Sequence, residues 1–261
     1  MGNETRNIKS IIFNPDEVVK PLYGVLEECH TSIIFGLQTI ELVNEIPTDF
    51  IIEDGFFSLK IGQEDEDIFI KKQKYKAWLI KKGFEDLVKG LEYTLREAYL
   101  YVSVFSKSAG LKTGQEFNEY FSKIRKKSLS MNIPNMMDEI ESYLEKPWSY
   151  KKQILSINKA RNCLVHRGGL VMEKDINDEI GRCLKLEWVK LKLFYEKEGE
   201  EIEIVGKTVV DAAIKLKRED NAISFVQGER IILDYKKFNE FVVTCFHFGL
   251  DLVACLPKII K

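Results

Sequence analysis

The sequence predicts a mainly α-helical fold: a bundle of amphipathic helices with a small antiparallel β insertion before the C-terminal helix. Apolar residues recur at three- and four-residue steps through most of the chain, which is the spacing of one buried helix face. Between about residues 184 and 234 they alternate with polar residues instead, which is typical of strands. No internal repeat or low-complexity linker divides the chain, so we expect a single domain over residues 10–261.

The first half of the chain predicts two long helices and an irregular segment between them. One helix begins at Asn14-Pro15-Asp16, because asparagine is a good N-cap and proline fits the first helical turn. Pro47 ends that helical region. Residues 48–69 mix apolar pairs with a glycine and an acidic run, which predicts a loop with one short element. A second helix follows over residues 70–107 with a regular apolar stripe.

Three shorter helices are predicted next, over residues 115–131, 134–144 and 149–165. Gly168 and Gly169 follow the third of them. Glycine readily adopts the left-handed conformation at which many helices end. We therefore expect helix up to this point and a different structure beyond it.

The β insertion is predicted from alternation and from turn signals. The apolar positions from Leu184 onward change phase after Trp188, which predicts a β-bulge near that residue. Turn-forming pairs at Glu198-Gly199, Asp220-Asn221 and Gln227-Gly228 separate the expected strands. These signals together predict a small antiparallel sheet.

The last predicted helix carries apolar residues from Phe238 to Leu256 and ends before Pro257. Its apolar face is wide enough to pack into a bundle or against a second copy of the chain. We find no apolar run long enough to span a membrane, and the polar N-terminus lacks the apolar core of a signal peptide. The sequence therefore predicts a cytoplasmic protein without a membrane partner.

Composition excludes several classes of function. The formal net charge is -2, so no global positive field attracts nucleic acid, and any such contact needs a local patch. The five cysteines are scattered and never form a CxxC pair, which fits neither a zinc site nor a disulfide framework. The sequence has no glycine-rich phosphate loop and no histidine–carboxylate metal set, so we expect no metal and no cofactor.

The strongest candidate for chemistry lies near the end of the 149–165 helix, at Arg161, Asn162 and His166. A histidine gains or loses a proton near neutral pH and an arginine does not, so the pair suits proton transfer beside a phosphate. Asn162 and His166 share one helix face at a four-residue step, so their side chains could hydrogen-bond. Arg161 lies about 140° around the helix from His166, but its long side chain can swing toward the same place.

The run Arg161-Asn162-Cys163-Leu164-Val165-His166 resembles the R-x4-6-H motif of the HEPN superfamily, in which a polar residue often follows the arginine. The resemblance covers this motif and the helical pattern on either side of it, but not the β insertion. It implies a HEPN-like helical bundle that cleaves RNA without a metal. It also implies a homodimer, because in this family two copies usually complete one site.

The resemblance further implies a role for each residue. His166 would act as general base or acid, Arg161 would stabilise charge on the scissile phosphate, and Asn162 would orient His166 or bind the phosphate. Lys159 and Arg167 flank the motif and would contact neighbouring phosphates. Such a ribonuclease fits a toxin or a defence effector, for which an antitoxin-like protein partner is expected.

Two alternatives stay open from the residues alone. In the first, Arg161 and His166 only close a helix, and Arg161 pairs with an acid of the 70–107 helix. In the second, the protein is a non-catalytic helical module that binds a nucleotide or a protein partner, with the β insertion as its recognition surface. Elsewhere, we expect packing roles for His30 and His247, which lie within strongly apolar helices.

Overall fold

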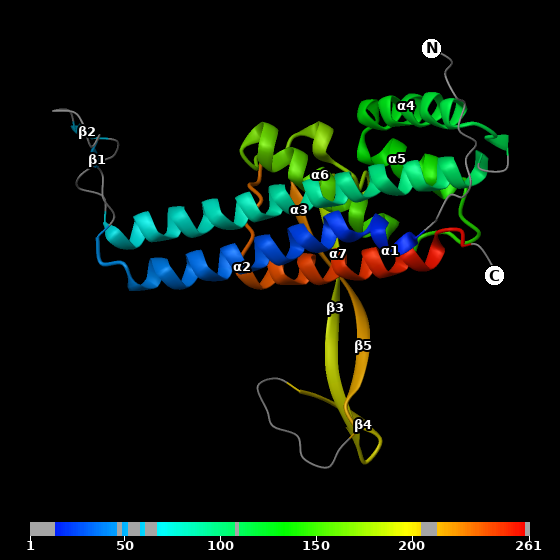
Figure 1. Ribbon diagram of the computed structural model, residues 1–261. Helices are drawn as coiled ribbons and strands as arrows, with labels where there is room; N and C mark the ends of the chain where they lie inside the picture. The colour runs from blue at the N-terminus through cyan, green and yellow to red at the C-terminus, as the bar shows by residue number, and fades with distance from the viewer. Residues whose placement is uncertain are drawn as a thin grey trace.

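The computed structural model describes residues 14–45, 49–51, 58–60, 67–107, 110–204 and 213–258. Its described part is mainly helical with a small three-stranded antiparallel sheet, as expected (Figure 1). The helices are α1 (Pro15–Val18), α2 (Lys20–Leu42), α3 (Ile68–Lys107), α4 (Gly114–Ser130), α5 (Ile133–Glu141), α6 (Lys151–Arg167) and α7 (Tyr235–Cys255). The strands are β1 (Asp49–Ile51), β2 (Ser58–Lys60), β3 (Cys183–Lys197), β4 (Glu200–Glu203) and β5 (Lys215–Val226).

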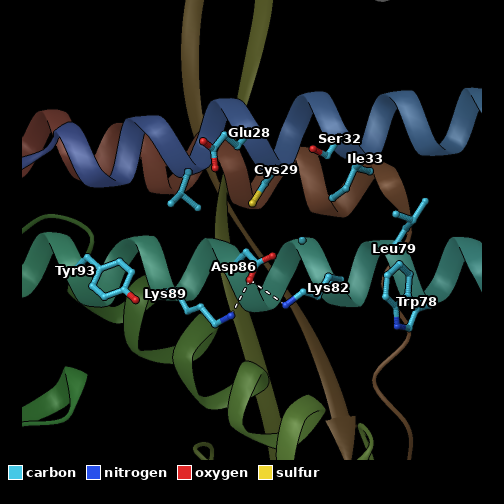
Figure 2. A pocket seen from close by; sticks show the side chains of 12 residues that line it. Glu28, Cys29, Ser32, Ile33, Trp78, Leu79, Lys82, Asp86, Lys89 and Tyr93 are labelled. Carbon is cyan, nitrogen blue, oxygen red and sulfur yellow. Dashed lines mark hydrogen bonds and ion pairs between the residues drawn. The ribbon is translucent and has the colours of Figure 1, made fainter.

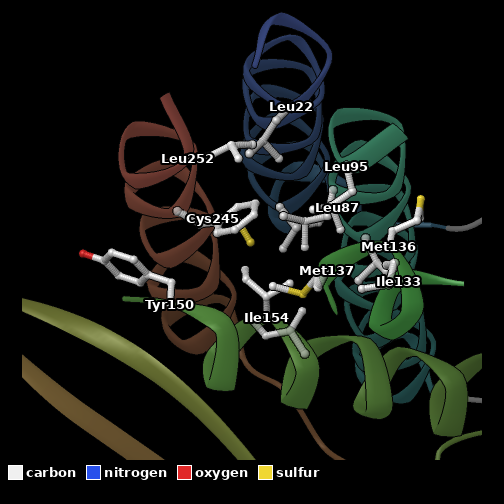
Figure 3. Packing of buried hydrophobic residues seen from close by; sticks show 14 of the residues in the cluster. Leu22, Leu87, Leu95, Ile133, Met136, Met137, Tyr150, Ile154, Cys245 and Leu252 are labelled. Carbon is white, nitrogen blue, oxygen red and sulfur yellow. The ribbon is translucent and has the colours of Figure 1, made fainter. Parts of the chain in front are cut away.

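The long helices α2, α3 and α7 run side by side, and α5 and α6 close the core against them (Figures 1 and 3). Each helix contributes apolar side chains that are fully or almost fully buried. They include Leu22 of α2, Leu87 and Leu95 of α3, Met136 and Met137 of α5, Ile154 of α6, and Cys245 and Leu252 of α7. Burying one large apolar side chain contributes about 1.5–3 kcal/mol, so this shared core is the main source of stability.

The structure confirms the predicted N-cap at Asn14 and shows a break in the first predicted helix. The Asn14 side chain accepts a hydrogen bond from the backbone N–H of Asp16 at 3.1 Å. The helix is interrupted at Val19, because Pro21 has no N–H to donate to the Glu17 carbonyl. Helix α2 ends at Leu42, before the predicted end at Pro47, which lies outside the described residues together with most of the 48–69 segment. The part described there forms the short antiparallel pair β1–β2.

Glycines allow α2 and α3 to pack closely along their length. A Cβ atom on Gly90 would lie 2.9 Å from Val25 Cβ, and one on Gly83 would lie 2.1 Å from Ile33 Cδ1. On α2, a Cβ atom on Gly36 would lie 2.6 Å from Leu79 Cδ1. These glycines lower the helix propensity of both segments, and the close approach of the two backbones explains their presence.

The sheet corrects three expectations. β3 and β5 pair one to one from Cys183↔Val226 to Phe194↔Lys215, so no extra residue is inserted and the bulge near Trp188 is wrong. The expected turn at Asp220-Asn221 lies inside β5, where Asn221 pairs with Trp188. The named strands of the insertion span residues 183–226, whereas 184–234 was expected. The turn at Glu198-Gly199 is confirmed, because both residues have positive φ, 56° and 86°, and they join β3 to β4.

The phase change in β3 reflects burial between two helices. Near the bundle, β3 contacts both α6 and α7, and both of its faces are buried over much of this part. Two buried hydroxyl groups hydrogen-bond the edge of β3 that does not pair with β5. Ser156 of α6 bonds the backbone of Glu187, and Thr244 of α7 bonds the backbone of Val189. Beyond these contacts the sheet projects away from the helices (Figure 1).

The final helix α7 corrects one further expectation. By length and composition alone it is apolar enough to cross a membrane, although we expected no such run. In the structure it is a core helix that contacts α2, α3 and β3. Phe238, Phe241 and Phe248 are fully buried there.

Candidate functional site

The Arg161–His166 motif occupies the last two turns of α6, where the sequence placed it. Gly168 ends the helix in the left-handed conformation with φ 58°. The N–H of Gly169, also at positive φ, donates to the Cys163 carbonyl at 3.1 Å. This C-terminal cap confirms the reason for the glycine pair and fixes where the helix stops.

Arg161 and Asn162 form a hydrogen-bonded pair. Arg161 Nη1 donates to Asn162 Oδ1 at 3.1 Å, whereas Arg161 Nε is buried and has no hydrogen-bond partner in the described part of the chain. Among the described residues, no carboxylate lies within ion-pair distance of Arg161. The alternative in which Arg161 pairs with an acid of α3 is therefore wrong for the described acids, and Glu92 of that helix pairs with Arg96 instead.

His166 is exposed, one turn beyond Asn162. No hydrogen bond joins these two side chains, and the Asn162 oxygen accepts from Arg161 instead. Within the described ranges the imidazole has no hydrogen-bond partner. The exposed imidazole is therefore not held by a protein partner within these ranges.

Arg167 has a role that residue spacing does not reveal. Its Nε donates to Asp175 Oδ2 at 2.6 Å, and its Nη2 makes a second, shorter bond to Oδ1. Asp175 is completely buried and also accepts from the backbone N–H of Met172 at 3.0 Å. The guanidinium thus anchors the segment after α6, and a phosphate that contacts its remaining N–H groups meets a charge that Asp175 already balances. Lys159, the other expected phosphate contact, is half-buried and has no ion pair among the described residues.

An open cavity of about 570 Å³ lies beside this helix end. Leu170 and Met172 give it an apolar surface, while Glu173, Lys174 and Gln227 provide polar groups at its sides. Arg167 also lines it, so the cavity adjoins the residue that follows His166. The sequence pattern marked Gln227 only as part of a turn and did not mark the others, which lie in the segment after α6 and in its short 3-10 helix Glu173–Asp175.

The other two histidines line a separate groove of about 470 Å³ between α2 and α7. His247 stacks on Tyr150 with ring centroids 6.4 Å apart, and Arg218 lies 4.2 Å from the centre of that tyrosine ring. Burial, and then the charge of Arg218, lower the pKa of His247 below its usual value. The packing role expected for His247 is confirmed, and His30 lines the same groove half-buried.

No protein-family model, curated protein or solved structure matches this chain. The likeness to the HEPN superfamily therefore depends on the motif and on the helices around it. The described residues hold no group of three or more histidine, cysteine, aspartate or glutamate side chains placed to bind one metal ion.

Proposed function

We propose that this protein is a metal-independent endoribonuclease of the HEPN type that acts as a toxin or defence effector. Arg161, Asn162 and His166 are its catalytic residues. The observation that supports the proposal is their arrangement on the last two turns of α6. There the exposed imidazole and the partly buried guanidinium have no carboxylate partner among the described residues, so both can engage an anionic substrate.

The reaction is attack by a ribose 2′-hydroxyl on the neighbouring phosphorus. A bond forms between O2′ and phosphorus while the bond from phosphorus to the 5′-oxygen breaks, which leaves a 2′,3′-cyclic phosphate and a 5′-hydroxyl. A base must take the 2′-hydroxyl proton and an acid must protonate the leaving oxygen, and an imidazole suits either step. Arg161 stabilises the charge that develops on the phosphate oxygens, and its bond to Asn162 orients it for that task.

One copy of the chain supplies an incomplete site under this proposal. Arg161 and His166 point about 140° apart around α6, and a single imidazole cannot be base and acid at the same moment. A second copy of the same helix end supplies the missing group. The proposed enzyme is therefore a cytoplasmic homodimer, and an antitoxin-like protein partner would act by covering or separating this site.

The proposal is tested with the purified protein and a set of varied RNAs in the presence of EDTA. We expect cleavage that leaves 2′,3′-cyclic phosphate ends, and its loss in His166→Ala and in Arg161→Ala. His30→Ala is the matched control, because it removes a histidine from α2 and leaves α6 unchanged. If all the RNAs stay intact at enzyme excess, the ribonuclease proposal is wrong.

The need for two copies has a separate test. Wild-type protein is co-refolded with about ninefold excess of His166→Ala protein, and activity per wild-type chain falls about tenfold if one site needs both imidazoles. Unchanged activity per wild-type chain shows instead that each copy cleaves alone. Light scattering on the same samples measures the oligomeric state directly.

The alternative function, a non-catalytic binding module, is favoured by one observation. The β3–β5 ribbon projects from the bundle and exposes the paired residues Leu193 and Leu216, which are about half-exposed. Apolar side chains on a projecting ribbon suit recognition of a protein partner. This function predicts intact RNA and a complex that survives Arg161→Ala, which a pull-down measures.

A further inference from the structure

Two grooves lie beside α2, and they differ in how their charged groups are paired. In the groove between α2 and α3, Asp86 accepts hydrogen bonds from Lys82 at 3.2 Å and from Lys89 at 2.9 Å (Figure 2). Glu28 lines the facing wall, so the charges of that groove are balanced. The groove between α2 and α7 contains the carboxylate of Glu27, which forms no ion pair within the described ranges. The unbalanced groove is therefore the one on the α7 side of α2.

This groove continues onto one face of the projecting sheet. Side chains alternate between the two faces of a strand, and residues that oppose each other on paired strands share a face. The register therefore places Leu193 and Tyr195 of β3, Ile202 of β4 and Leu216 of β5 on one face. Leu191 precedes them on that face of β3 and lines the α2–α7 groove. These five residues form an apolar strip that begins in the groove and runs along the sheet.

The opposite face of the sheet is charged, and its side chains pair with one another. The ion pairs there are Lys190–Glu203 at 3.3 Å, Lys215–Glu196 at 2.7 Å and Lys217–Glu201 at 2.9 Å. Phe194 on that face is 6% exposed, whereas Leu193 beside it on the apolar strip is 48% exposed and Leu216 is 58% exposed. An antiparallel sheet commonly packs its apolar face and leaves the polar face to water. The exposed strip therefore has the composition of a face that another element covers.

The size of the strip indicates a single element as its occupant. Three strands make a sheet about 14 Å wide, and the five residues from Leu191 to Tyr195 span about 17 Å, which gives about 240 Å² in projection. A stable interface between two globular proteins buries about 800 Å² per partner, so a second copy of the chain needs far more surface than the strip offers. An α-helix is about 10–12 Å across with its side chains, which matches the width of the strip.

Two cations border the strip, and both have partners. Arg218 pairs with Asp220 at 3.6 Å and lies 4.2 Å from the centre of the Tyr150 ring. Lys197 lies opposite Glu200 in the register of β3 and β4, so these two charges offset each other.

Two carboxylates are left over, one at each end of the strip. Glu27 lies in the groove and Glu198 lies in the turn between β3 and β4. Both are exposed and form no ion pair among the described residues. Seven residues of extended chain separate Leu191 from Glu198, which is about 23 Å, and a helix of about 15 residues has that length. An apolar middle with an anionic group at each end suits a helix that has an apolar stripe and a basic residue near each end.

We propose that the apolar strip binds a basic amphipathic helix of a partner protein, whose apolar stripe packs on the strip and whose lysines or arginines reach Glu27 and Glu198. A helix packed on one face of a sheet is a common layered arrangement in proteins. The site uses none of Arg161, Asn162 and His166, so it does not depend on the ribonuclease proposal. It gives the alternative binding function a definite class of partner.

The experiment measures fluorescence anisotropy of a labelled helical peptide of about 15 residues, with a leucine stripe and lysines at both ends, against the full chain. We expect saturable binding that weakens about tenfold in Leu216→Ala, because a buried leucine contact is lost. Lys217→Ala is the matched control, because this neighbouring side chain points to the opposite face and its removal leaves binding unchanged. Glu27→Gln and Glu198→Gln each weaken binding about twofold, and this effect disappears at high salt.

Two further peptides test the stripe and the charge separately. A scrambled peptide of the same composition has no stripe, and a peptide with glutamate in place of lysine has the wrong charge, so we expect both to bind more weakly. Circular dichroism confirms that each protein variant is folded. The proposal is overturned if the basic helix does not bind, if Leu216→Ala binds it as tightly as the unaltered protein, or if either further peptide binds equally well. Light scattering tests the other occupant: a dimer that Leu216→Ala dissociates overturns the proposal in favour of contact between two copies. RNA cleavage enters none of these measurements.

Discussion

His166 and Arg167 are neighbours at the end of α6, yet their side chains have opposite surroundings. The His166 imidazole is exposed and has no partner among the described residues. The Arg167 guanidinium makes two hydrogen bonds to one buried carboxylate, that of Asp175. Adjacent helix positions point about 100° apart, so one faces solvent and the other faces the loop that follows the helix. Local sequence places both residues at the helix end but does not tell which of them is free.

Removal of Asp175 tests the structural role of Arg167. Asp175→Ala leaves the Arg167 charge partly buried without its partner, so we expect the free energy of unfolding to fall by about 3 kcal/mol. Urea denaturation monitored by circular dichroism measures the change. Glu173→Ala removes an exposed acid from the same segment and changes stability by about 0.5 kcal/mol or less. Equal effects of the two substitutions contradict a buried ion pair at Asp175.

The candidate site could be predicted in part at this scale. The helix end at Gly168 was predictable because a glycine pair directly after a periodic apolar pattern is typical of a left-handed C-terminal cap. The bond between Arg161 and Asn162 was not predictable, because helix spacing favoured a partner four residues away over the adjacent one. The ion pair of Arg167 with Asp175 depends on the path of the loop, which leaves no signature in residue spacing.

At the scale of elements, the contact of α2 with α3 shows why a glycine in a helix has to be judged by its neighbour. Gly90 faces Val25 at a distance that leaves no room for a methyl group, while Gly24 has nothing within 4 Å of the position where a Cβ would lie. Both lie inside helices. Helix propensity treats the two positions alike, and packing distinguishes them.

We expect opposite signs for alanine at these two glycines. Gly90→Ala places a methyl group 2.9 Å from Val25 Cβ, which α2 relieves only by shifting, so stability falls by about 1–3 kcal/mol. Gly24→Ala meets empty space and gains about 0.5–1 kcal/mol from higher helix propensity. Thermal unfolding of both variants measures the difference. A stabilising Gly90→Ala contradicts the close approach of the two helices.

The helices were predicted better than the strands, and the reason is visible in β3. Alternation along a strand reports which face is buried, and β3 changes from burial between α6 and α7 to exposure in the projecting ribbon. The change of phase predicted an inserted residue at Trp188, although the register is continuous. Asp220 and Asn221 were interpreted as a turn because the ribbon is solvated there and tolerates polar residues.

At the scale of the whole molecule, the chain divides into a helical bundle with a shared hydrophobic core and a ribbon whose far end contributes few side chains to that core. The ribbon is anchored where Ser156 and Thr244 bond the edge of β3. Beyond that point Leu193 and Leu216 are exposed. We therefore expect the bundle to fold without the far end of the ribbon.

A shortened ribbon tests this division. We replace residues 193–216 with Asn-Gly, which joins Lys192 to Lys217, a pair whose backbones face each other across β3 and β5, through a two-residue hairpin turn in their existing register. The helical signal in circular dichroism is expected to persist, and the midpoint of thermal unfolding is expected to change by a few degrees at most, because few buried side chains are lost. Loss of cooperative unfolding contradicts the division. Ribonuclease activity that survives the truncation, together with loss of partner capture, assigns separate tasks to the bundle and the ribbon.

The backbone around His166 is held from several directions. Amides of the glycine cap bond the Cys163 carbonyl, Arg230 donates to the Gly168 carbonyl at 3.0 Å, and Arg167 ties the next segment through Asp175. The imidazole therefore adjusts to a ligand by rotating its side chain and not by moving the chain that carries it. Under the proposed ribonuclease function, the RNA then has to adapt to this fixed group, because its 2′-hydroxyl must turn into line with the bond that breaks. Unpaired nucleotides make that turn easily and stacked, paired ones do not, so we expect cleavage in loops and bulges and sparing of continuous duplex.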